Sequence, residues 1–239
     1  MRKSVFVFVL LAASVSGYAQ EGAKPWTDWS KKDAEKVLND SSWGQTYVQE
    51  AAEPVSTTVI TNTRPGLAGG SNGESGEVKA SRALKYRARF LTAKPVREAF
   101  SRLIVLSQPN ANDGLKGQLQ GFIDRDFGDF LVISFSIESE DPRISKGAMM
   151  GLGRLTAEMI KDKISLERKD GKKATLIDYK VPVEDGMGAK IVFSRTLDGK
   201  PFLGEGDDFV RLTFQLSEKQ KISMKFKVTG MTYGGKLEY

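Results

Sequence analysis

Cysteine and histidine are both absent from the 239 residues of this chain. Without cysteine the chain cannot form disulfide bonds or zinc sites with thiolate ligands. Without histidine it cannot form a Ser-His-Asp triad, a Cys-His nucleophile or a His-ligated haem site. We therefore predict no metal site, no cofactor site and no catalytic residue. The sequence alone does not say what the protein does.

The rest of the composition is ordinary for a globular protein, with 40% hydrophobic and 28% charged residues. These fractions exclude wholesale disorder and a collagen-like or coiled-coil rod. A chain of this length can bury a core that is stable without disulfide bonds.

The first 19 residues have the pattern of a secretory signal peptide. Two basic residues, Arg2 and Lys3, precede an apolar run over residues 5–15, and Gly17 and Ala19 supply the small side chains that signal peptidase requires. The run is shorter than the about 20 apolar residues of a membrane-spanning helix. We expect residues 1–19 to be removed and the mature protein to be secreted or periplasmic, with no transmembrane segment.

The charge balance of the mature protein is nearly even. Removal of Arg2 and Lys3 lowers the basic count from 36 to 34, against 30 acidic residues, which leaves a net charge of +4. So small an excess does not predict nucleic-acid binding. We expect no nucleic-acid partner, and consider an anionic envelope polymer or an envelope protein instead.

The pattern along the mature chain predicts one domain with an α+β fold. Short N-terminal helices precede a mostly antiparallel sheet or sandwich in the C-terminal half. Residues 20–62 contain a helix bracketed by tryptophans and then a strand over residues 46–61. Residues 63–78 are rich in glycine and are expected to form a flexible loop. Residues 79–239 complete the domain.

The N-terminal helix is expected over residues 31–39, because Ser30 can cap it and Asp33 places a carboxylate in its first turn. The three tryptophans of the chain bracket this helix: Trp26, Trp29 and Trp43. They are either an aromatic platform for a sugar ring or anchors that hold the helix to the domain. We favour anchors, since buried aromatic rings dominate packing energies.

Residues 84–90 alternate between apolar and basic side chains and predict a half-buried strand. Lys85, Arg87 and Arg89 are expected on its exposed face. This face could bind an anionic polymer, or its long cations could deter edge-to-edge aggregation of strands. We favour aggregation control.

Further elements follow from apolar periodicity and turn residues. Helices are expected from Pro95 to residue 108 and over residues 115–122, and a central strand over residues 130–137. Residues 147–153 show no readable period.

Two dipeptides in the C-terminal half favour tight hairpin turns. Asp170-Gly171 lies between expected strands over residues 164–169 and 174–179, and Asp198-Gly199 follows another strand. Residues 209–216 and 222–228 alternate and predict a further hairpin. The second of these strands carries three lysines on its outer side: Lys221, Lys225 and Lys227.

Carboxylates cluster at two points, Asp124-Arg-Asp-Phe-Gly-Asp129 and Glu205-Gly-Asp-Asp208. The first cluster lacks the spacing, the glycine and the bidentate glutamate of a calcium loop. Both are typical of solvated turns. A carboxylate-dependent hydrolase acting on envelope carbohydrate is the alternative function, since glycosidases work with two carboxylates.

The run Trp-Ser-Lys-Lys-Asp-Ala-Glu-Lys-Val-Leu-Asn-Asp-Ser-Ser-Trp, over residues 29–43, resembles the opening of a group of uncharacterised secreted bacterial proteins. Residues 185–195 and 231–239 are also similar to that group, which has proline where this chain has Ser42. The resemblance implies an exported protein and carries over no catalytic residue. We therefore predict a non-catalytic binding or structural protein of the cell envelope.

Overall fold

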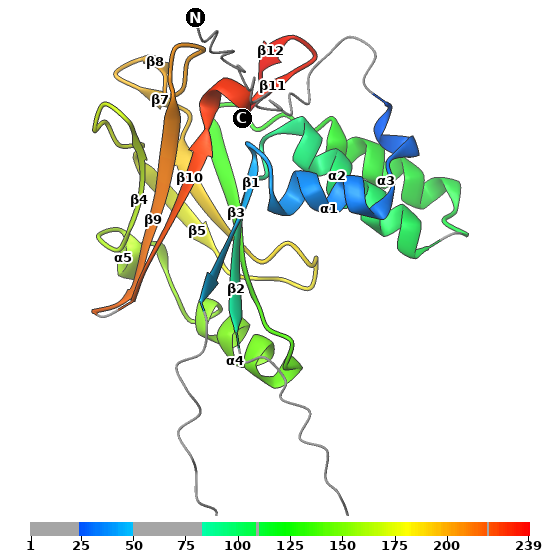
Figure 1. Ribbon diagram of the computed structural model, residues 1–239, viewed down its shortest axis with the longest axis horizontal. Coiled ribbons are helices and arrows are strands. Elements are labelled where there is room, and N and C mark those ends of the chain that lie inside the picture. The colour runs from blue at the N-terminus through cyan, green and yellow to red at the C-terminus, as the bar shows by residue number, and fades with distance from the viewer. Residues whose placement is uncertain (1–23, 50–82, 109, 219) are drawn as a thin grey trace, which may run out of the picture.

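The computed structural model describes residues 24–49, 83–108, 110–218 and 220–239 (Figure 1). These residues form an α+β fold whose strands pair antiparallel throughout, which confirms the predicted fold class. The expected signal peptide over residues 1–19, the glycine-rich loop over residues 63–78 and the expected strand beyond Gln49 lie outside the described residues.

The larger sheet has five strands in the order β1-β2-β3-β6-β5. Their bounds are β1 Gly44–Gln49, β2 Leu84–Phe90, β3 Phe130–Glu138, β6 Ala189–Ser194 and β5 Leu176–Lys180. The predicted strands over residues 84–90 and 130–137 are confirmed. The nearly continuous apolar run of β3 is explained by its central place in the sheet.

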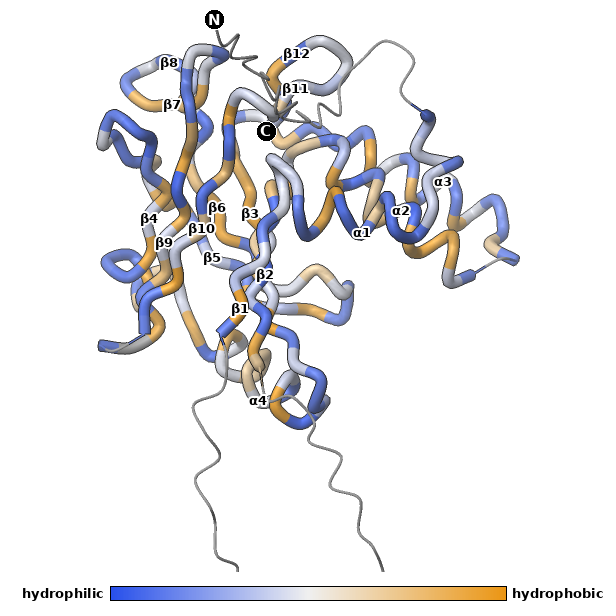
Figure 2. The backbone as a smooth tube through the Cα atoms, in the orientation of Figure 1, coloured by the Kyte–Doolittle hydropathy of each residue, from blue (hydrophilic) through white to orange (hydrophobic). Residues whose placement is uncertain are grey.

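The smaller sheet has three strands in the order β10-β9-β4. They are β10 Gln220–Lys227, β9 Phe209–Ser217 and β4 Ile164–Arg168. Figure 2 shows hydrophilic and hydrophobic residues alternating along β9 and β10. Two short hairpins, β7 Thr196–Leu197 with β8 Lys200–Pro201 and β11 Thr232–Tyr233 with β12 Lys236–Leu237, and the 3₁₀ turn η2 Val228–Gly230 complete the C-terminal half.

The main core lies between the inner faces of the two sheets. Phe90 of β2 meets Phe226 of β10 edge-on, with ring centroids 5.0 Å apart, and Phe135 of β3 meets Phe214 of β9 at 5.3 Å. All four rings are buried. This arrangement of two packed sheets gives β2 and β3 one face toward the core and one face toward the helices.

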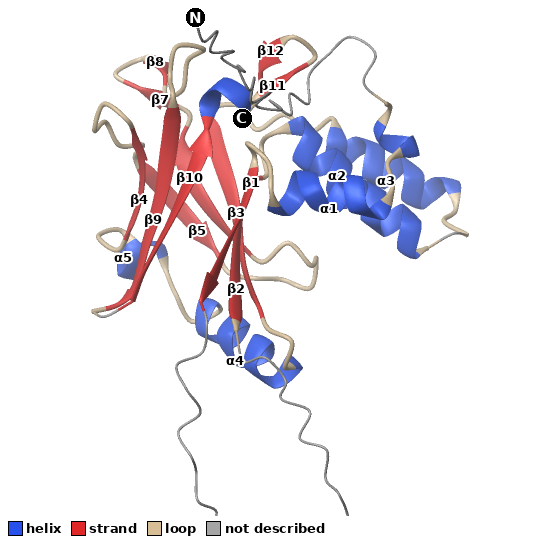
Figure 3. Cartoon of the chain, viewed as in Figure 1, coloured by secondary structure: helices blue, strands red, loops and turns tan. Residues whose placement is uncertain are grey.

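The helices are η1 Trp26–Asp28, α1 Lys31–Asn39, α2 Lys94–Ser107, α3 Asp113–Ile123, α4 Pro142–Leu152 and α5 Ala157–Ile160. Figure 3 shows α1, α2 and α3 grouped at one side of the strands. The N-terminus of α1 is a capping box, in which Ser30 and Asp33 each accept a hydrogen bond from the backbone N–H of the other. The helices predicted over residues 31–39, 95–108 and 115–122 are confirmed. Among the described residues, no helix has the length and apolar character to cross a membrane.

The two predicted turns have different outcomes. Asp198 and Gly199 both have positive φ, 53° and 73°, and close the β7–β8 hairpin as expected. The turn at Gly171 also forms, but it closes only a short ladder, through hydrogen bonds such as Ala174 N to Leu166 O at 2.9 Å. Beyond it β4 and β5 belong to different sheets, so the expectation of a full hairpin there is wrong.

Candidate functional site

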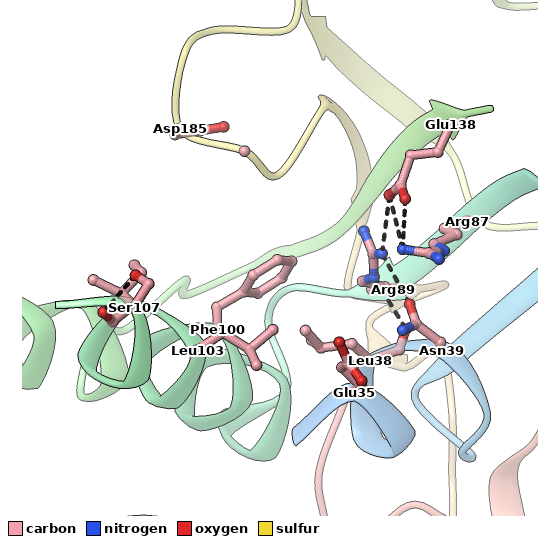
Figure 4. Close-up of a pocket in the computed structure, with 12 residues that line it drawn as sticks. Glu35, Leu38, Asn39, Arg87, Arg89, Phe100, Leu103, Ser107, Glu138 and Asp185 are labelled. Carbon is pink, nitrogen blue, oxygen red and sulfur yellow. Dashed lines mark hydrogen bonds and ion pairs between the residues drawn. The ribbon is translucent and has the colours of Figure 1, made fainter. Parts of the chain in front are cut away.

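A cleft of about 490 Å³ lies between α1, α2, the helix-facing side of β2 and β3, and the loop before β6 (Figure 4). Its volume falls in the range of small-molecule sites. Its lining residues are Glu35, Leu38, Asn39, Arg87, Arg89, Phe100, Leu103, Ile104, Ser107, Glu138, Asp185 and Gly186.

One part of the cleft is apolar. Phe100 and Leu103 of α2 are half-buried and pack against the core with one side. Leu38 of α1 is buried beside them, and Figure 4 shows the Phe100 ring between the charged end of the cleft and Ser107. Phe100 and Leu103, which are only partly buried, offer apolar surface to a ligand.

Arg89 anchors the charged end of the cleft. Its Nε donates to Leu38 O at 3.0 Å, and its guanidinium nitrogens donate to Asn39 Oδ1 at 3.0 Å and to Ser136 Oγ at 3.2 Å. These bonds satisfy a free carbonyl in the last turn of α1, where a cation also suits the helix dipole. Burial, and secondarily the nearby Arg87, lower the pKa of Arg89 to about 10, so it stays charged at neutral pH.

Arg87 lies two residues before Arg89 on the same face of β2. Its Nη1 donates to the Glu138 carboxylate, at 2.9 Å from Oε1 and 2.7 Å from Oε2. The Glu138 Oε1 atom also lies 3.9 Å from Arg89 Nη2, so two arginines share one carboxylate. The Arg87 Nε is buried and has no hydrogen-bond partner among the described residues.

The sequence-based expectation of an exposed triad of cations is therefore wrong for Arg89, which is only 3% exposed. The alternation correctly placed Lys85, Arg87 and Arg89 on one face, but α1 and α2 cover part of that face. Lys85 pairs with Glu140 at 3.8 Å and Arg87 with Glu138. Partner carboxylates thus neutralise most of the charge that the local sequence contains.

The loop before β6 forms the remaining wall. Asp185 pairs with Lys190 of β6, and its Oδ1 accepts a hydrogen bond from Met187 N at 2.9 Å. Gly188, with φ +84°, lets this loop approach β3, since a Cβ there would lie 2.2 Å from Phe135 O. A side chain at Gly188 would displace the wall of the cleft.

The tryptophans do not form one exposed platform. Trp43 is 2% exposed, donates from Nε1 to Glu238 O at 2.7 Å and meets Tyr233 edge-on at 6.5 Å. Trp29 is half-buried against the core and donates from Nε1 to Lys24 O at 2.9 Å. Trp26 is partly exposed in η1. A sugar ring therefore cannot stack on all three.

The carboxylate clusters sit in turns. Asp126 Oδ1 accepts the Gly128 N–H at 2.8 Å, and Gln120 and then Lys94 lower the pKa of Asp124 through hydrogen bonds. Asp208 pairs with Lys169, and Asp207 accepts the Gly204 N–H at 2.8 Å. Within the described ranges, no three acidic side chains converge as metal ligands.

Glu98 of α2 is a buried carboxyl group outside the cleft lining. Burial raises its pKa, although the hydrogen bond from Tyr233 Oη opposes that shift. Tyr233 belongs to β11, so this contact ties the C-terminal hairpin to α2.

Sequence reasoning missed Glu138, Asn39 and Phe100 as parts of one site. Helical spacing marked Phe100 as apolar, but it could not show that the ring sits at the border of a cleft. Glu138 is the last residue of β3. The apolar residues of this strand drew attention away from the polar residues that alternate on its helix-facing side, which are Ser134, Ser136 and Glu138. That period-two series was the available signal.

The sequence matches no protein-family model and no curated protein. Among solved structures, the chain is similar to a protein of unknown function from Burkholderia pseudomallei, with a TM-score of 0.37 and 15% identity. The match covers 59% of this chain and 72% of that chain. A likeness this distant supports no functional inference, and the resemblance of residues 29–43 to secreted proteins stays a prediction.

Proposed function

We propose that the protein is an exported, non-catalytic binding protein of the cell envelope that holds a small anionic ligand with an apolar part in the cleft beside Arg87. The observation that carries the proposal is that Arg87, whose Nε is buried and has no partner among the described residues, lines a cleft with an apolar part.

The anionic group follows from the chemistry of Arg87. Its Nη1 donates to the Glu138 carboxylate, whereas its Nε–H has no acceptor among the described residues. A buried donor without a partner costs about 1–3 kcal/mol, which a ligand acceptor would offset. Guanidinium groups bind carboxylates and phosphates through charged hydrogen bonds, so a ligand anion is the natural acceptor.

The apolar part follows from Phe100, Leu103 and Leu38. A ligand methylene that leaves water for such a surface gains about 0.8 kcal/mol when fully buried. A chain of several methylenes can therefore contribute as much as the ion pair. We expect affinity to depend on both ends of the ligand.

No feature of the described residues favours the hydrolase. Three carboxylates line the cleft, and each pairs with a cation: Glu138 with Arg87, Asp185 with Lys190, and Glu35 with Lys31 at 3.8 Å. Glu98, the carboxyl group whose pKa burial raises, lies outside the cleft. The proposal is therefore binding without catalysis.

Isothermal titration calorimetry with octanoate, octyl phosphate and octanamide tests the proposal. The two anions should bind and the uncharged amide should bind at least tenfold more weakly, because only the anions pair with Arg87. Equal affinity for all three, or no binding by any of them, would contradict it.

Two variants separate the cleft from its surroundings. Arg87→Gln should reduce anion affinity at least tenfold. Lys85→Gln removes a cation from the same strand face outside the cleft and should leave the affinity within a factor of about two. Similar losses in both variants would indicate long-range attraction rather than a site at Arg87.

A further inference from the structure

The outer face of the three-stranded sheet is the side of the molecule opposite the cleft. Its inner face packs on the five-stranded sheet through Phe214 and Phe226, whereas the cleft lies beyond the far face of that sheet. In Figure 1, β9 and β10 lie to the left of β1, β2 and β3, and α1, α2 and α3 lie to the right of them.

Four cations point outward from this face. Along β10, Ile222, Met224 and Phe226 are buried, so the residues between them face solvent. We call the following set the basic face: Arg211 of β9 and Lys221, Lys225 and Lys227 of β10. All four are exposed, and none has a carboxylate within 4.0 Å among the described residues.

The nearby carboxylates are taken by other lysines. Glu167 of β4 lies opposite Arg211 in register, but it pairs with Lys173 at 3.6 Å. Asp208, which precedes β9, pairs with Lys169, and Lys225 of the basic face also contributes, as a smaller cause, to lowering the pKa of Asp208. The face therefore keeps a net positive charge, in contrast to the β2 face.

The register places like charges directly opposite each other. Lys225 of β10 lies directly opposite Arg211 of β9 in the strand register. Like charges in this position destabilise an isolated sheet. The Phe209 ring partly compensates, since it lies 3.9 Å from Lys225 Nζ and 5.6 Å from Arg211 Cζ. An external anion would relieve the remaining repulsion.

We propose that the basic face docks the protein on an anionic lipid surface, independently of any ligand in the cleft. The outward residues of a strand lie in one row about 7 Å apart, so their charges reach a flat surface together. A planar array of cations fits a planar array of lipid phosphates. Docked in this way, the protein keeps its cleft on the side away from the membrane.

Co-sedimentation with lipid vesicles tests this proposal. The sample is the protein expressed from the complete sequence and purified as the cell exports it. Vesicles of phosphatidylcholine with phosphatidylglycerol should retain the protein, and vesicles of phosphatidylcholine alone should not. Each cation at an anionic surface contributes about fivefold in binding, which corresponds to about 1 kcal/mol. Replacement of all four residues of the basic face by Gln should thus weaken binding by more than a hundredfold.

A matched variant controls for net charge. It replaces four exposed lysines on other elements by Gln: Lys32, Lys116, Lys146 and Lys236. Its binding should stay within about fivefold of the parent, and binding of the parent should disappear at 1 M salt, where the Debye length is about 3 Å. Equal losses in both variants, no vesicle binding by the parent, or retention by soluble polyphosphate but not by vesicles would each overturn the proposal.

Discussion

Arg87 and Arg89 show how two identical side chains on one strand face acquire different roles. Arg89 lies under the end of α1 and bonds to Leu38 O and Asn39, whereas the Nε of Arg87 has no partner among the described residues. Depth below the helices, rather than residue type, separates the structural arginine from the one that we propose to bind the ligand.

Arg89→Lys should destabilise the fold by about 3 kcal/mol. A lysine cannot reproduce the guanidinium fork, so buried acceptors on α1 and Ser136 would lose their donor. Urea unfolding at pH 7 measures the loss. Lys85→Gln, a change at a partly exposed side chain of the same strand, should shift stability by only about 0.5 kcal/mol. A similar small shift for Arg89→Lys would contradict the structural role.

Glu98 should make stability depend on pH in a definite direction. Burial raises its folded pKa above the unfolded value, so its contribution is fully present below the unfolded pKa of about 4.3 and is lost as pH rises through the folded pKa. Glu98→Gln keeps an acceptor for Tyr233 but does not titrate. The melting temperature of the parent minus that of Glu98→Gln should therefore fall as the pH rises above about 4.3. A difference that is constant or rises with pH would refute the burial argument.

At the scale of elements, α1 connects the N-terminal segment to the rest of the fold. The helix packs on α2 and β1, and Trp43, just beyond its end, reaches the C-terminal segment through Glu238 O. This hydrogen bond joins two residues that lie 195 positions apart in the sequence.

Trp43→Ala should cost at least about 3 kcal/mol, because it removes a buried ring and leaves a cavity. Trp26→Ala, at a partly exposed ring in η1, should cost less than half as much. Chemical unfolding of the two variants gives the comparison. Equal losses would show that burial of Trp43 does not set its contribution.

The elements that were predicted correctly are those whose capping residues or apolar periodicity match the burial seen in the structure. The cap at Ser30 marked the start of α1, and strict alternation marked β2, β9 and β10. Sequence reasoning missed α4, because Gly147 and Gly151 dilute the helical pattern, although Asp141 and Pro142 offered a cap and a first-turn proline. Alternation predicts which face of a sheet a side chain occupies, but it does not predict whether helices cover that face. For this reason Arg89 was predicted to be exposed and the cleft was not predicted.

At the scale of the whole molecule, two surfaces of different character lie on opposite sides of the packed sheets. The cleft beside α1 and α2 combines paired charges with apolar surface, whereas the cations of the basic face have no carboxylate within 4.0 Å in the described part of the chain. The first suits a small ligand and the second a charged surface. Export to the envelope, which we predict from the pattern of residues 1–19, would bring both into reach of such partners.

The predicted signal peptide can be tested on the intact protein. We expect the mature chain to begin near Gln20, since Gly17 and Ala19 supply the small residues of a cleavage site. N-terminal sequencing of protein from the exported fraction measures the start. Recovery of an intact Met1 in the membrane pellet would contradict export by cleavage.

The most direct test of the binding site observes the Arg87 Nε–H group itself. In a nitrogen-15-labelled sample, the Arg87 Nε–H signal is assigned by its absence from the Arg87→Gln variant. Titration with octanoate should move this signal and slow its hydrogen exchange, with the same dissociation constant as calorimetry, because the buried donor gains an acceptor. A signal that stays in place while octanoate binds would contradict a ligand anion at Arg87.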